Sequence, residues 1–432
     1  MIRKITEKLI EWKNNPHHKP LLIRGARQVG KSFSIMEFGK KYFEGDVHII
    51  NLERNPDLHV IFELNLDTNR IISELELVLN KKIRIGKDLL FFDEIQECPN
   101  AIKSLRYFYE QHQALHMIAA GSLLEFALQD ISFPVGRLQM LNMYPLTFEE
   151  FLLAREKTLI LEEIQQAGQE LQPNIVSLVN TELYKYFIVG GMPECVANYI
   201  KTGSYIEVGN IQSDLMATFR QDFSKYSPHS DKRCLNSVLD SVSQKVGSQI
   251  KYAHLSQDFS NPTIKKAYEL METAHLFHSV KATSPAGLPF GASASQKKFK
   301  AVFLDIGLLA YMNGFSKKEL FSKQKLFKAF SGIMAEQFVG QELLANSQDR
   351  LYYWSRDARN SSAEVDYLME KDSEIIPIEV KSGKSGRLKS LHLLLESYDN
   401  IKRAHVFTED KYGELPEQKL TFYPLFCVGF VS

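Results

Sequence analysis

Cysteine is scarce in this chain of 432 residues, and the four that it has, Cys98, Cys195, Cys234 and Cys427, lie far apart. None of them forms the C-x-x-C pair that is typical of zinc ribbons and redox centres, and the spacing does not suggest a secreted disulfide scaffold. No stretch reaches the roughly 18 consecutive apolar residues of a membrane-spanning helix. Residues 1–15 alternate charged and apolar side chains, which indicates an amphipathic helix rather than a signal peptide. We therefore expect a cytoplasmic protein with no membrane partner.

The chain also lacks net charge, because 52 Lys and Arg balance 52 Asp and Glu. Neutrality argues against a nucleic-acid partner, but a total can hide an uneven distribution. Between Ser230 and Phe330 there are 15 basic and seven acidic residues, so this block carries +8 and the rest of the chain −8. A hydrophobic content of 44% excludes a disordered chain. The length exceeds what one core usually organises, so we expect several domains.

A glycine-rich loop follows the apolar run Leu21–Ile23 and precedes a helical pattern. Its G-x-x-x-x-G-K-S spacing lets backbone N–H groups face a phosphate at the start of a helix. Lys31 can then reach the β- and γ-phosphates of ATP, and the Ser32 hydroxyl can join the shell of Mg²⁺. An ordinary glycine-rich turn is the alternative. The candidate nucleotide-binding residues are Gly25, Ala26, Arg27, Gln28, Val29, Gly30, Lys31, Ser32 and Phe33.

A second apolar run, Leu89–Phe92, follows Asp88 and ends in the two carboxylates Asp93 and Glu94, as a buried strand would. Next to a phosphate-binding loop in a parallel sheet, Asp93 would lie near Mg²⁺ and Glu94 could polarise the attacking water. The alternative is a strand that simply ends in solvated acids.

Two further residues are candidates for ATP hydrolysis. Ser122 follows the apolar run His116–Ala120, where a polar residue could sense the γ-phosphate, or could cap the next helix. Arg137 could act as an arginine finger or as the anchor of a salt bridge.

These segments together resemble a known family, the prokaryotic AAA-type ATPases that carry a C-terminal domain of unknown function. The resemblance spans nearly the whole chain and rests on GARQVGKS, LLFFDEIQECP, AAGS, VGRLQMLNMYPLTFEEF and VGGMPE. It implies a P-loop ATPase core, a helical lid, a winged-helix region and a nuclease-like terminal fold.

The middle of the chain reads as helical. Thr147 and Glu150 form a capping box, and helical patterns at 162–171 and 175–189 end at the break Gly190–Pro193. This part is either a lid that closes on the nucleotide, with a glycine hinge, or a helical spacer.

Three helices at 234–246, 254–259 and 262–274, followed by strands at 276–280 and 300–304, are the pattern of a winged helix. Its lysines would contact DNA or RNA phosphates without reading the bases. The alternative is a winged helix that packs against protein. The lysines expected at phosphates are Lys265, Lys266, Lys297, Lys298 and Lys300.

The last hundred residues predict the order α-β-β-β-α-β and resemble the PD-(D/E)xK nuclease core. Asp366 and Glu379 would hold Mg²⁺, and Lys381 would orient a water or stabilise the developing charge. Glu336 matches an acidic helix residue of that superfamily, whereas Val365 stands where its motif has proline. An inactive fold that keeps these charges as a salt-bridge cluster is the alternative.

We therefore expect an α/β chain with a P-loop NTPase parallel sheet of the AAA+/STAND-like type. The expected domains are the ATPase core (1–143), the helical lid (144–229), the winged helix (230–330) and a restriction-endonuclease-like α/β domain (331–432). The expected function is Mg-dependent ATP hydrolysis coupled to a nucleic-acid-directed module that could be a nuclease. The alternative is an ATP-driven switch whose modules bind proteins. A second copy of the chain is a further candidate partner.

Overall fold

The structure is a computed structural model that describes residues 1–129, 136–167, 171–223, 230–315, 324–346, 350–356, 363–382 and 388–431. The chain divides into two compact units, Ile2–Tyr144 and, together with Met1, Pro145–Ser432. The first expected boundary, after residue 143, lies one residue from this division. Among the described residues, no helix combines the length and the apolar character that crossing a membrane requires.

The first unit, Ile2–Tyr144, is an α/β fold with a five-stranded parallel sheet in the order β2-β3-β4-β1-β5. The glycine-rich loop joins β1 to α2, as the sequence predicts. The strands are β1 (Leu21–Arg24), β2 (Val47–Asn51), β3 (Leu89–Asp93), β4 (His116–Ala120) and β5 (Gln139–Asn142). The α-helices are α1 (Ile5–Asn14), α2 (Lys31–Tyr42), α3 (Val60–Glu63), α4 (Thr68–Leu79), α5 (Pro99–Gln111) and α6 (Leu124–Gln129).

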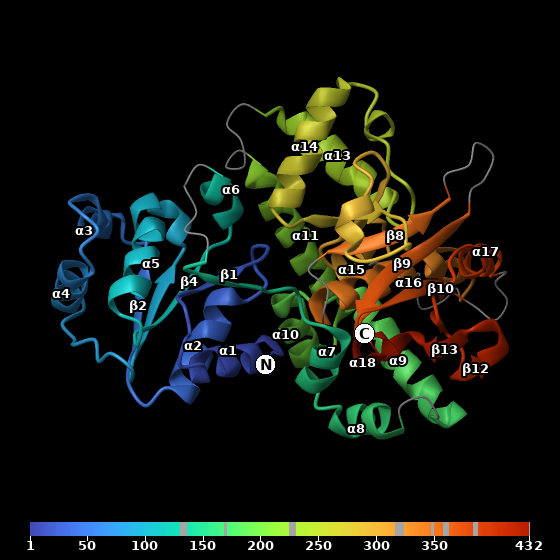
Figure 1. Ribbon diagram of the computed structural model, residues 1–432, viewed down its shortest axis with the longest axis horizontal. Coiled ribbons are helices and arrows are strands. Elements are labelled where there is room, and N and C mark those ends of the chain that lie inside the picture. The colour runs from blue at the N-terminus through green and yellow to red at the C-terminus, as the bar shows by residue number, and fades with distance from the viewer. Residues whose placement is uncertain are drawn as a thin grey trace. The chain divides into compact units, whose positions relative to one another are not determined.

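Helices cover both faces of this sheet, and α1 and α2 lie opposite α4 and α5 (Figure 1). Alternate side chains of β3 account for the two layers. Leu90 and Phe92 pack in the same core as Ile71 of α4 and Leu105 of α5. All the apolar residues of β3 are buried, which is the reason that a parallel strand reads as a continuous apolar run.

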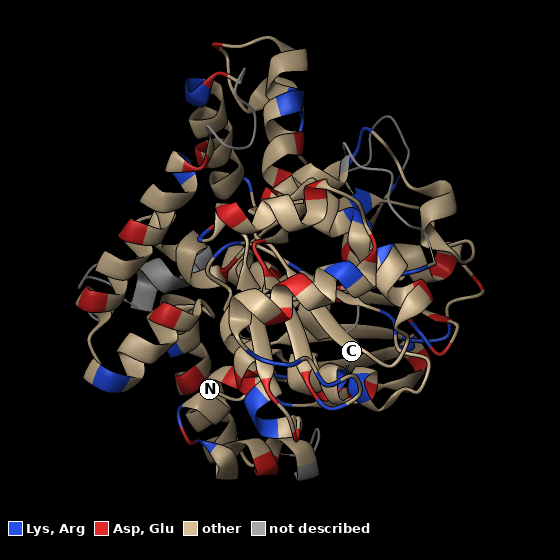
Figure 2. Cartoon of the chain, turned by 90° about the vertical axis from the view of Figure 1, so that its left-hand side faces the viewer, with Lys and Arg blue, Asp and Glu red and all other residues tan. Residues whose placement is uncertain are grey.

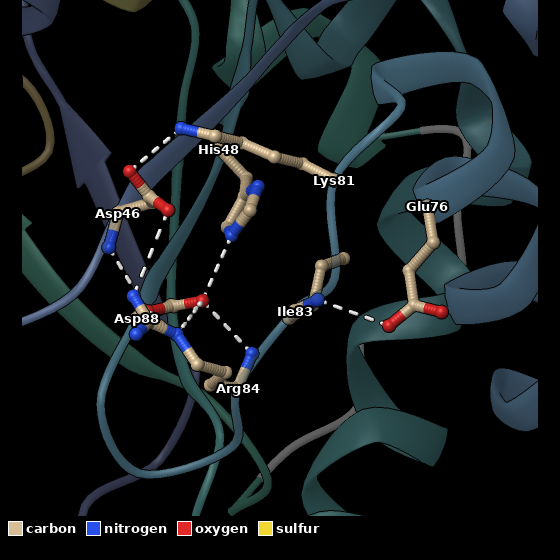
Figure 3. Close-up of polar contacts among 7 residues, drawn as sticks. All are labelled: Asp46, His48, Glu76, Lys81, Ile83, Arg84 and Asp88. Atoms are coloured by element: carbon tan, nitrogen blue, oxygen red, sulfur yellow. Dashed lines mark hydrogen bonds and ion pairs between the residues drawn. The ribbon is translucent and has the colours of Figure 1, made fainter.

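A buried carboxylate fixes the amino end of β3 (Figure 3). Asp88 Oδ1 accepts the Asp46 N–H at 2.9 Å, and Asp88 Oδ2 accepts the Arg84 N–H at 2.8 Å. His48 Nε2 lies 3.0 Å from Asp88 Oδ2, and the Arg84 guanidinium is 2.9 Å from Oδ1. Burial by itself raises the pKa of Asp88, but these hydrogen bonds outweigh it and hold the pKa well below its ordinary value.

In the described residues, seven α-helices of the second unit precede a mixed eight-stranded sheet, whose order is β12-β13-β11-β10-β9-β8-β6-β7. Its α-helices are α7 (Phe148–Ala154), α8 (Thr158–Ala167), α9 (Pro173–Val189), α10 (Pro193–Thr202), α11 (Tyr205–Gln221), α13 (Lys232–Gln244), α14 (Asn261–Thr273), α15 (Ile306–Met312), α16 (Gln324–Asn346), α17 (Lys389–Ser397) and α18 (Val428–Val431). Its strands are β6 (Phe277–Ala282), β7 (Phe299–Phe303), β8 (Leu351–Ser355), β9 (Glu364–Lys371), β10 (Glu374–Lys381), β11 (Ala404–Thr408), β12 (Gly413–Leu415) and β13 (Leu420–Pro424).

The order α16-β8-β9-β10-α17-β11 confirms the α-β-β-β-α-β order that the sequence predicts. The hairpin β6–β7, which was expected as a wing, continues the same sheet because β6 pairs with β8. The expected helix at 254–259 is wrong: a single 3₁₀ turn, Tyr252–His254, takes its place. Leu255 is buried, but Ser256 and Asp258, residues that favour turns over helix interiors, follow it. Of the helix expected at 162–171, residues 168–170 lie outside the described part.

The break at Gly190–Pro193 is closely packed within the second unit. Asp305 Oδ2 accepts the Gly191 N–H at 2.6 Å, and the Gly191 carbonyl accepts the Leu146 N–H at 2.7 Å. A Cβ on Gly191 would lie 2.1 Å from the Leu146 carbonyl oxygen, and one on Gly190 would lie 2.2 Å from Asp305 Oδ1. These glycines allow the close approach of neighbouring groups, and the contacts give no support to a freely moving hinge.

Candidate functional site

The phosphate-binding loop has the backbone that its sequence predicts. Gly25 has φ +137° and Gly30 has φ +91°, a region that glycine adopts without strain. A Cβ on Gly25 would lie 2.1 Å from the carbonyl oxygen of Met143, so only glycine fits there. Gly30 precedes the first residue of α2, which directs the free N–H groups of this helix toward the loop.

Lys31 lies inside this loop with its ammonium held by backbone oxygens. Its Nζ donates to the carbonyls of Gly25 and Ala26, both at 2.8 Å. Burial lowers the pKa of Lys31 to about 8, against the opposing charges of Glu94 and Asp93. A phosphate beside the ammonium would raise this pKa again, because an opposite charge favours the protonated form.

Ser32 and Asp93, the two candidate Mg²⁺ ligands, are in direct contact. Ser32 Oγ donates to Asp93 Oδ1 at 2.7 Å, and Asn51 Nδ2 donates to Asp93 Oδ2 at 3.0 Å. Burial raises the pKa of Asp93, although the bonds from Ser32 and Asn51 oppose the shift. A hydroxyl and a carboxylate side by side are oxygen ligands of the kind that Mg²⁺ prefers, so these residues fit the ion.

Glu94 and Ser122, expected as base and sensor, also come together. Ser122 donates to Glu94 Oε2 from its hydroxyl at 3.1 Å and from its backbone N–H at 3.3 Å. Gln96 Nε2 donates to the same oxygen at 2.8 Å. Helix α6 begins at Leu124, so Ser122 is not in the capping position directly before it.

Arg137 is not brought to the loop. It precedes β5, and the register Leu21↔Gln139 sets this strand end beside the start of β1, whereas the loop leaves the end of β1. Its Nε is 3.2 Å from Glu110 Oε1 on α5. Since β1 and β5 are parallel, Arg137 lies at the amino ends of the strands, whereas the phosphate loop lies at their carboxyl ends.

Four predicted residues of the C-terminal core do converge. Lys381 Nζ donates to Glu379 Oε1 at 2.5 Å, as two residues on one face of β10 can. Asp366 Oδ2 on β9 accepts the Val380 N–H at 2.8 Å. Glu336 on α16 faces the same cluster, and burial, followed by the charge of Asp366, raises the pKa of both Glu336 and Glu379.

The prediction for Lys300 is wrong. Its side chain is 1% exposed and so cannot reach the phosphates of a nucleic acid. Its Nζ instead lies 2.9 Å from Glu336 Oε1 and 3.6 Å from Asp366 Oδ1, and it pairs with Glu364. The apolar neighbours Phe299 and Ala301–Phe303 turn this lysine inward with its strand.

The exposed part of the basic block is smaller than its sequence indicates. Lys265, Lys266 and Lys297 are exposed, and Lys265 lies 3.6 Å from Glu269 one turn on. Figure 2 shows basic and acidic residues interspersed along the visible elements. The side chains of five further lysines of the block lie outside the described residues: Lys317, Lys318, Lys323, Lys325 and Lys328.

A cavity of about 870 Å³ borders Lys381. Helix α9 lines one side with Asn180 and Tyr184, and the end of β11 and the residues after it line the other with Thr408 and Tyr412. Hydroxyl, amide and aromatic groups around a space of this size could hold a small polar ligand or an inserted side chain.

Sequence reasoning missed three partners of the ATP-site residues and of the C-terminal cluster. Asn51 had a signal, because it follows a short β-branched segment that contains Val47, Ile49 and Ile50, as Asp93 follows its own apolar run. Gln96 had none. Glu364 also had no signal. It lies two residues before Asp366 on the same strand, and Asp366 already fitted the expected motif.

Comparison with known proteins supports the assignment of the first unit. Residues 17–152 match the model of a family described as an AAA domain. Residues 180–319 and 331–427 match two families described as domains of unknown function, DUF8612 and DUF4143.

An uncharacterized protein of Haemophilus influenzae is 23% identical over 425 residues, which are 95% of this chain and 93% of that protein. Among solved structures, a Walker-type ATPase of Pyrococcus abyssi is 14% identical with a TM-score of 0.44, over 71% of this chain and 94% of that one. The RuvB Holliday junction branch migration motor of Thermotoga maritima is 14% identical with a TM-score of 0.29, over 66% and 90%.

Proposed function

We propose that this chain is an AAA-type P-loop ATPase that binds ATP with Mg²⁺ and couples its hydrolysis to the unit Pro145–Ser432. The observation that carries the proposal is the contact of Ser32 with Asp93 beside the buried Lys31. In a cytoplasmic setting, the four free cysteines, all buried, would stay reduced.

Each residue of the site would have one task. The backbone of Gly25–Ser32 would wrap the phosphates, and Lys31 would exchange its two carbonyl partners for phosphate oxygens. Ser32 and Asp93 would hold Mg²⁺, which would neutralise charge on the phosphates. Glu94 would orient and activate the attacking water, and Ser122 would contact the γ-phosphate. The ion pair with Glu110 supports the anchor role for Arg137, and an arginine from a second copy of the chain stays a prediction.

The chain itself offers a path for coupling. Met143 packs its carbonyl against Gly25 of the loop, and three residues later Leu146 bonds to Gly191 of the second unit. Only Tyr144 and Pro145 lie between these two anchored residues. A shift of the loop upon phosphate binding would therefore act directly on the first residues of the second unit.

The ATP site is tested by two variants with matched controls. We expect Lys31→Ala to weaken ATP binding roughly ten- to hundredfold, the effect of a lost charged hydrogen bond. Glu94→Gln should leave binding intact and lower the hydrolysis rate roughly a hundredfold or more. The exposed neighbours Lys40→Ala and Glu97→Gln should change neither. Unchanged binding by Lys31→Ala would contradict the phosphate loop, and unchanged hydrolysis by Glu94→Gln would exclude its role as base.

Two functions are candidates for the second unit. A nucleic-acid-directed module, with or without nuclease chemistry, is supported by the exposed Lys265, Lys266 and Lys297 and by the convergence of Asp366, Glu379 and Lys381. A switch that binds a protein partner without cleavage is supported by the internal pairing of the same charges.

Salt dependence separates these two functions. If nucleic acid binds through lysines, Lys265→Ala/Lys266→Ala should weaken binding of DNA or RNA and lower the slope of log affinity against log salt by about two. Fluorescence anisotropy with single- and double-stranded DNA and with RNA, at two salt concentrations, measures this slope. Lys40→Ala is the control. No salt-dependent binding to any of them would favour the protein-binding switch.

A further inference from the structure

The PD-(D/E)xK resemblance implies a metal between Asp366 and Glu379, and the contacts of these residues test whether they fit one. Asp366 Oδ2 is taken by the Val380 N–H, and Glu379 Oε1 by Lys381. Asp366 Oδ1 faces Lys300 at 3.6 Å. Glu379 Oε2 alone among these four oxygens is buried without a hydrogen-bond partner. Across the residues that the structure describes, no three His, Cys, Asp or Glu side chains are arranged to hold a metal ion.

A cation already lies among these carboxylates. Lys300 Nζ approaches Glu336 of α16 and both Glu364 and Asp366 of β9, and it also lies 5.1 Å from the ring centre of Tyr353 on β8. Three separate elements thus surround one ammonium whose side chain is 1% exposed. Burial alone would lower the pKa of Lys300, but the charges of Glu336, Asp366 and Glu364 raise it above its ordinary value. An ammonium enclosed by three carboxylates would repel a divalent cation brought beside it.

We infer that Lys300 is the resident cation of this cluster and takes the place of a metal ion. The side chain comes from β7, in the segment 230–330, whereas the carboxylates come from α16 and β9. The cluster therefore fastens the hairpin β6–β7 to the C-terminal core. In this arrangement, Asp366 and Glu379 bind no Mg²⁺, and the core has no metal-dependent nuclease activity. The inference does not rest on the ATPase assignment, which concerns the other unit.

Metal binding tests the inference directly. We would count bound Mn²⁺ by electron paramagnetic resonance without nucleotide, in the full chain carrying Asp93→Asn so that the ATP site does not contribute. We expect the same count with and without Asp366→Asn. A bound Mn²⁺ that disappears with Asp366→Asn, or cleavage of DNA or RNA that does so, would overturn the inference. This comparison leaves Lys300 in place and so does not depend on the folding of a Lys300 variant.

A double-mutant cycle tests the pairing itself. Lys300→Met should lower the unfolding midpoint on the order of 10 °C, because it leaves buried carboxylates without their counter-ion. If the pairing holds, the loss in Lys300→Met/Asp366→Asn should be clearly smaller than the sum of the two single losses. Lys297→Met, in the exposed connection of the same hairpin, should leave the midpoint unchanged. A midpoint of Lys300→Met equal to that of the parent chain, or strictly additive losses, would show that Lys300 does not neutralise the cluster.

Discussion

Asp88 illustrates how a single buried residue contributes to the fold. Its carboxylate accepts hydrogen bonds from Asp46 and Arg84 and contacts His48, so it joins the starts of β2 and β3 to the turn before β3. The side chain is fully buried. We expect Asp88→Asn to lower the free energy of unfolding by roughly 2–3 kcal/mol, because an amide nitrogen would then face donors that need an acceptor.

The pH dependence of this effect has a definite sign. Hydrogen bonds hold the pKa of Asp88 below its ordinary value in the folded chain. The stabilisation is therefore fully present above the unfolded pKa of about 3.9 and is lost as the pH falls through the folded pKa. Urea unfolding at neutral pH and near pH 3 should show a difference between parent and Asp88→Asn that shrinks in acid. The exposed Asp57→Asn should show little difference at either pH, and a difference for Asp88→Asn that grows in acid would contradict this account.

Two lysines show which side-chain positions a sequence predicts and which it does not. Lys31 belongs to a spaced motif in which each position has a backbone reason, so the sequence alone predicts its place. Lys300 is flanked by Phe299, Ala301, Val302 and Phe303. A charge inside an apolar run indicates a buried partner but does not say which one, because the carboxylates come from strands and helices distant in sequence.

At the scale of elements, the glycines of the Gly190–Pro193 break have two interpretations: a hinge that moves, or a point of close packing. The sequence predicts that α9 ends there, and the structure confirms it. The hydrogen bonds to Asp305 and Leu146 show why glycine is required: a side chain has no room beside these groups.

Gly191→Ala tests this close packing. A Cβ would lie 2.1 Å from the Leu146 carbonyl oxygen. This is a backbone atom, so it cannot move aside without moving the chain around it. We expect a loss of about 2–3 kcal/mol in the unfolding free energy of the second unit, the usual cost of overpacking. Gly287→Ala is a matched control, since neither glycine has positive φ and no atom lies within 4 Å of a Cβ at Gly287. Equal stability of Gly191→Ala and the parent chain would restore the hinge interpretation.

Short-range rules also predicted the capping box. Thr147 Oγ1 accepts the Glu150 N–H at 3.3 Å, and Glu150 Oε2 accepts the Thr147 N–H at 2.8 Å. The failed helix at 254–259 had no comparable signal, because its apolar residues, Leu255 and Phe259, were not flanked by a cap or by strong helix formers. Local hydrogen bonds determine where a helix begins or ends. A sequence therefore predicts a helix end where it contains recognisable capping residues.

At the scale of the molecule, the chain has two compact units, and two of the three boundaries expected from the sequence fall inside the second unit. The boundary after residue 143 follows a motif and lies one residue from the division between the units. The boundaries at 229 and 330 follow changes in local pattern, whereas the second unit is continuous across both. Pairing of β6 with β8 is the reason, because a hairpin that adds to the edge of a sheet shares its core.

The sequence by itself determined the candidate ATP site: the loop at 25–32, the carboxylates Asp93 and Glu94 and the nearby Ser122. Each of them lies at the carboxyl end of a strand of one parallel sheet or within two residues after it, apart from the part of the loop that leads into α2, and these strand ends meet at one edge. The tertiary structure alone decided the rest. It placed Arg137 at the opposite edge, made Asn51 and Gln96 partners of the acids, and turned Lys300 from a surface contact into a buried counter-ion. These outcomes depend on which distant elements become neighbours, and a buried charge is stable only beside the partners that packing brings to it.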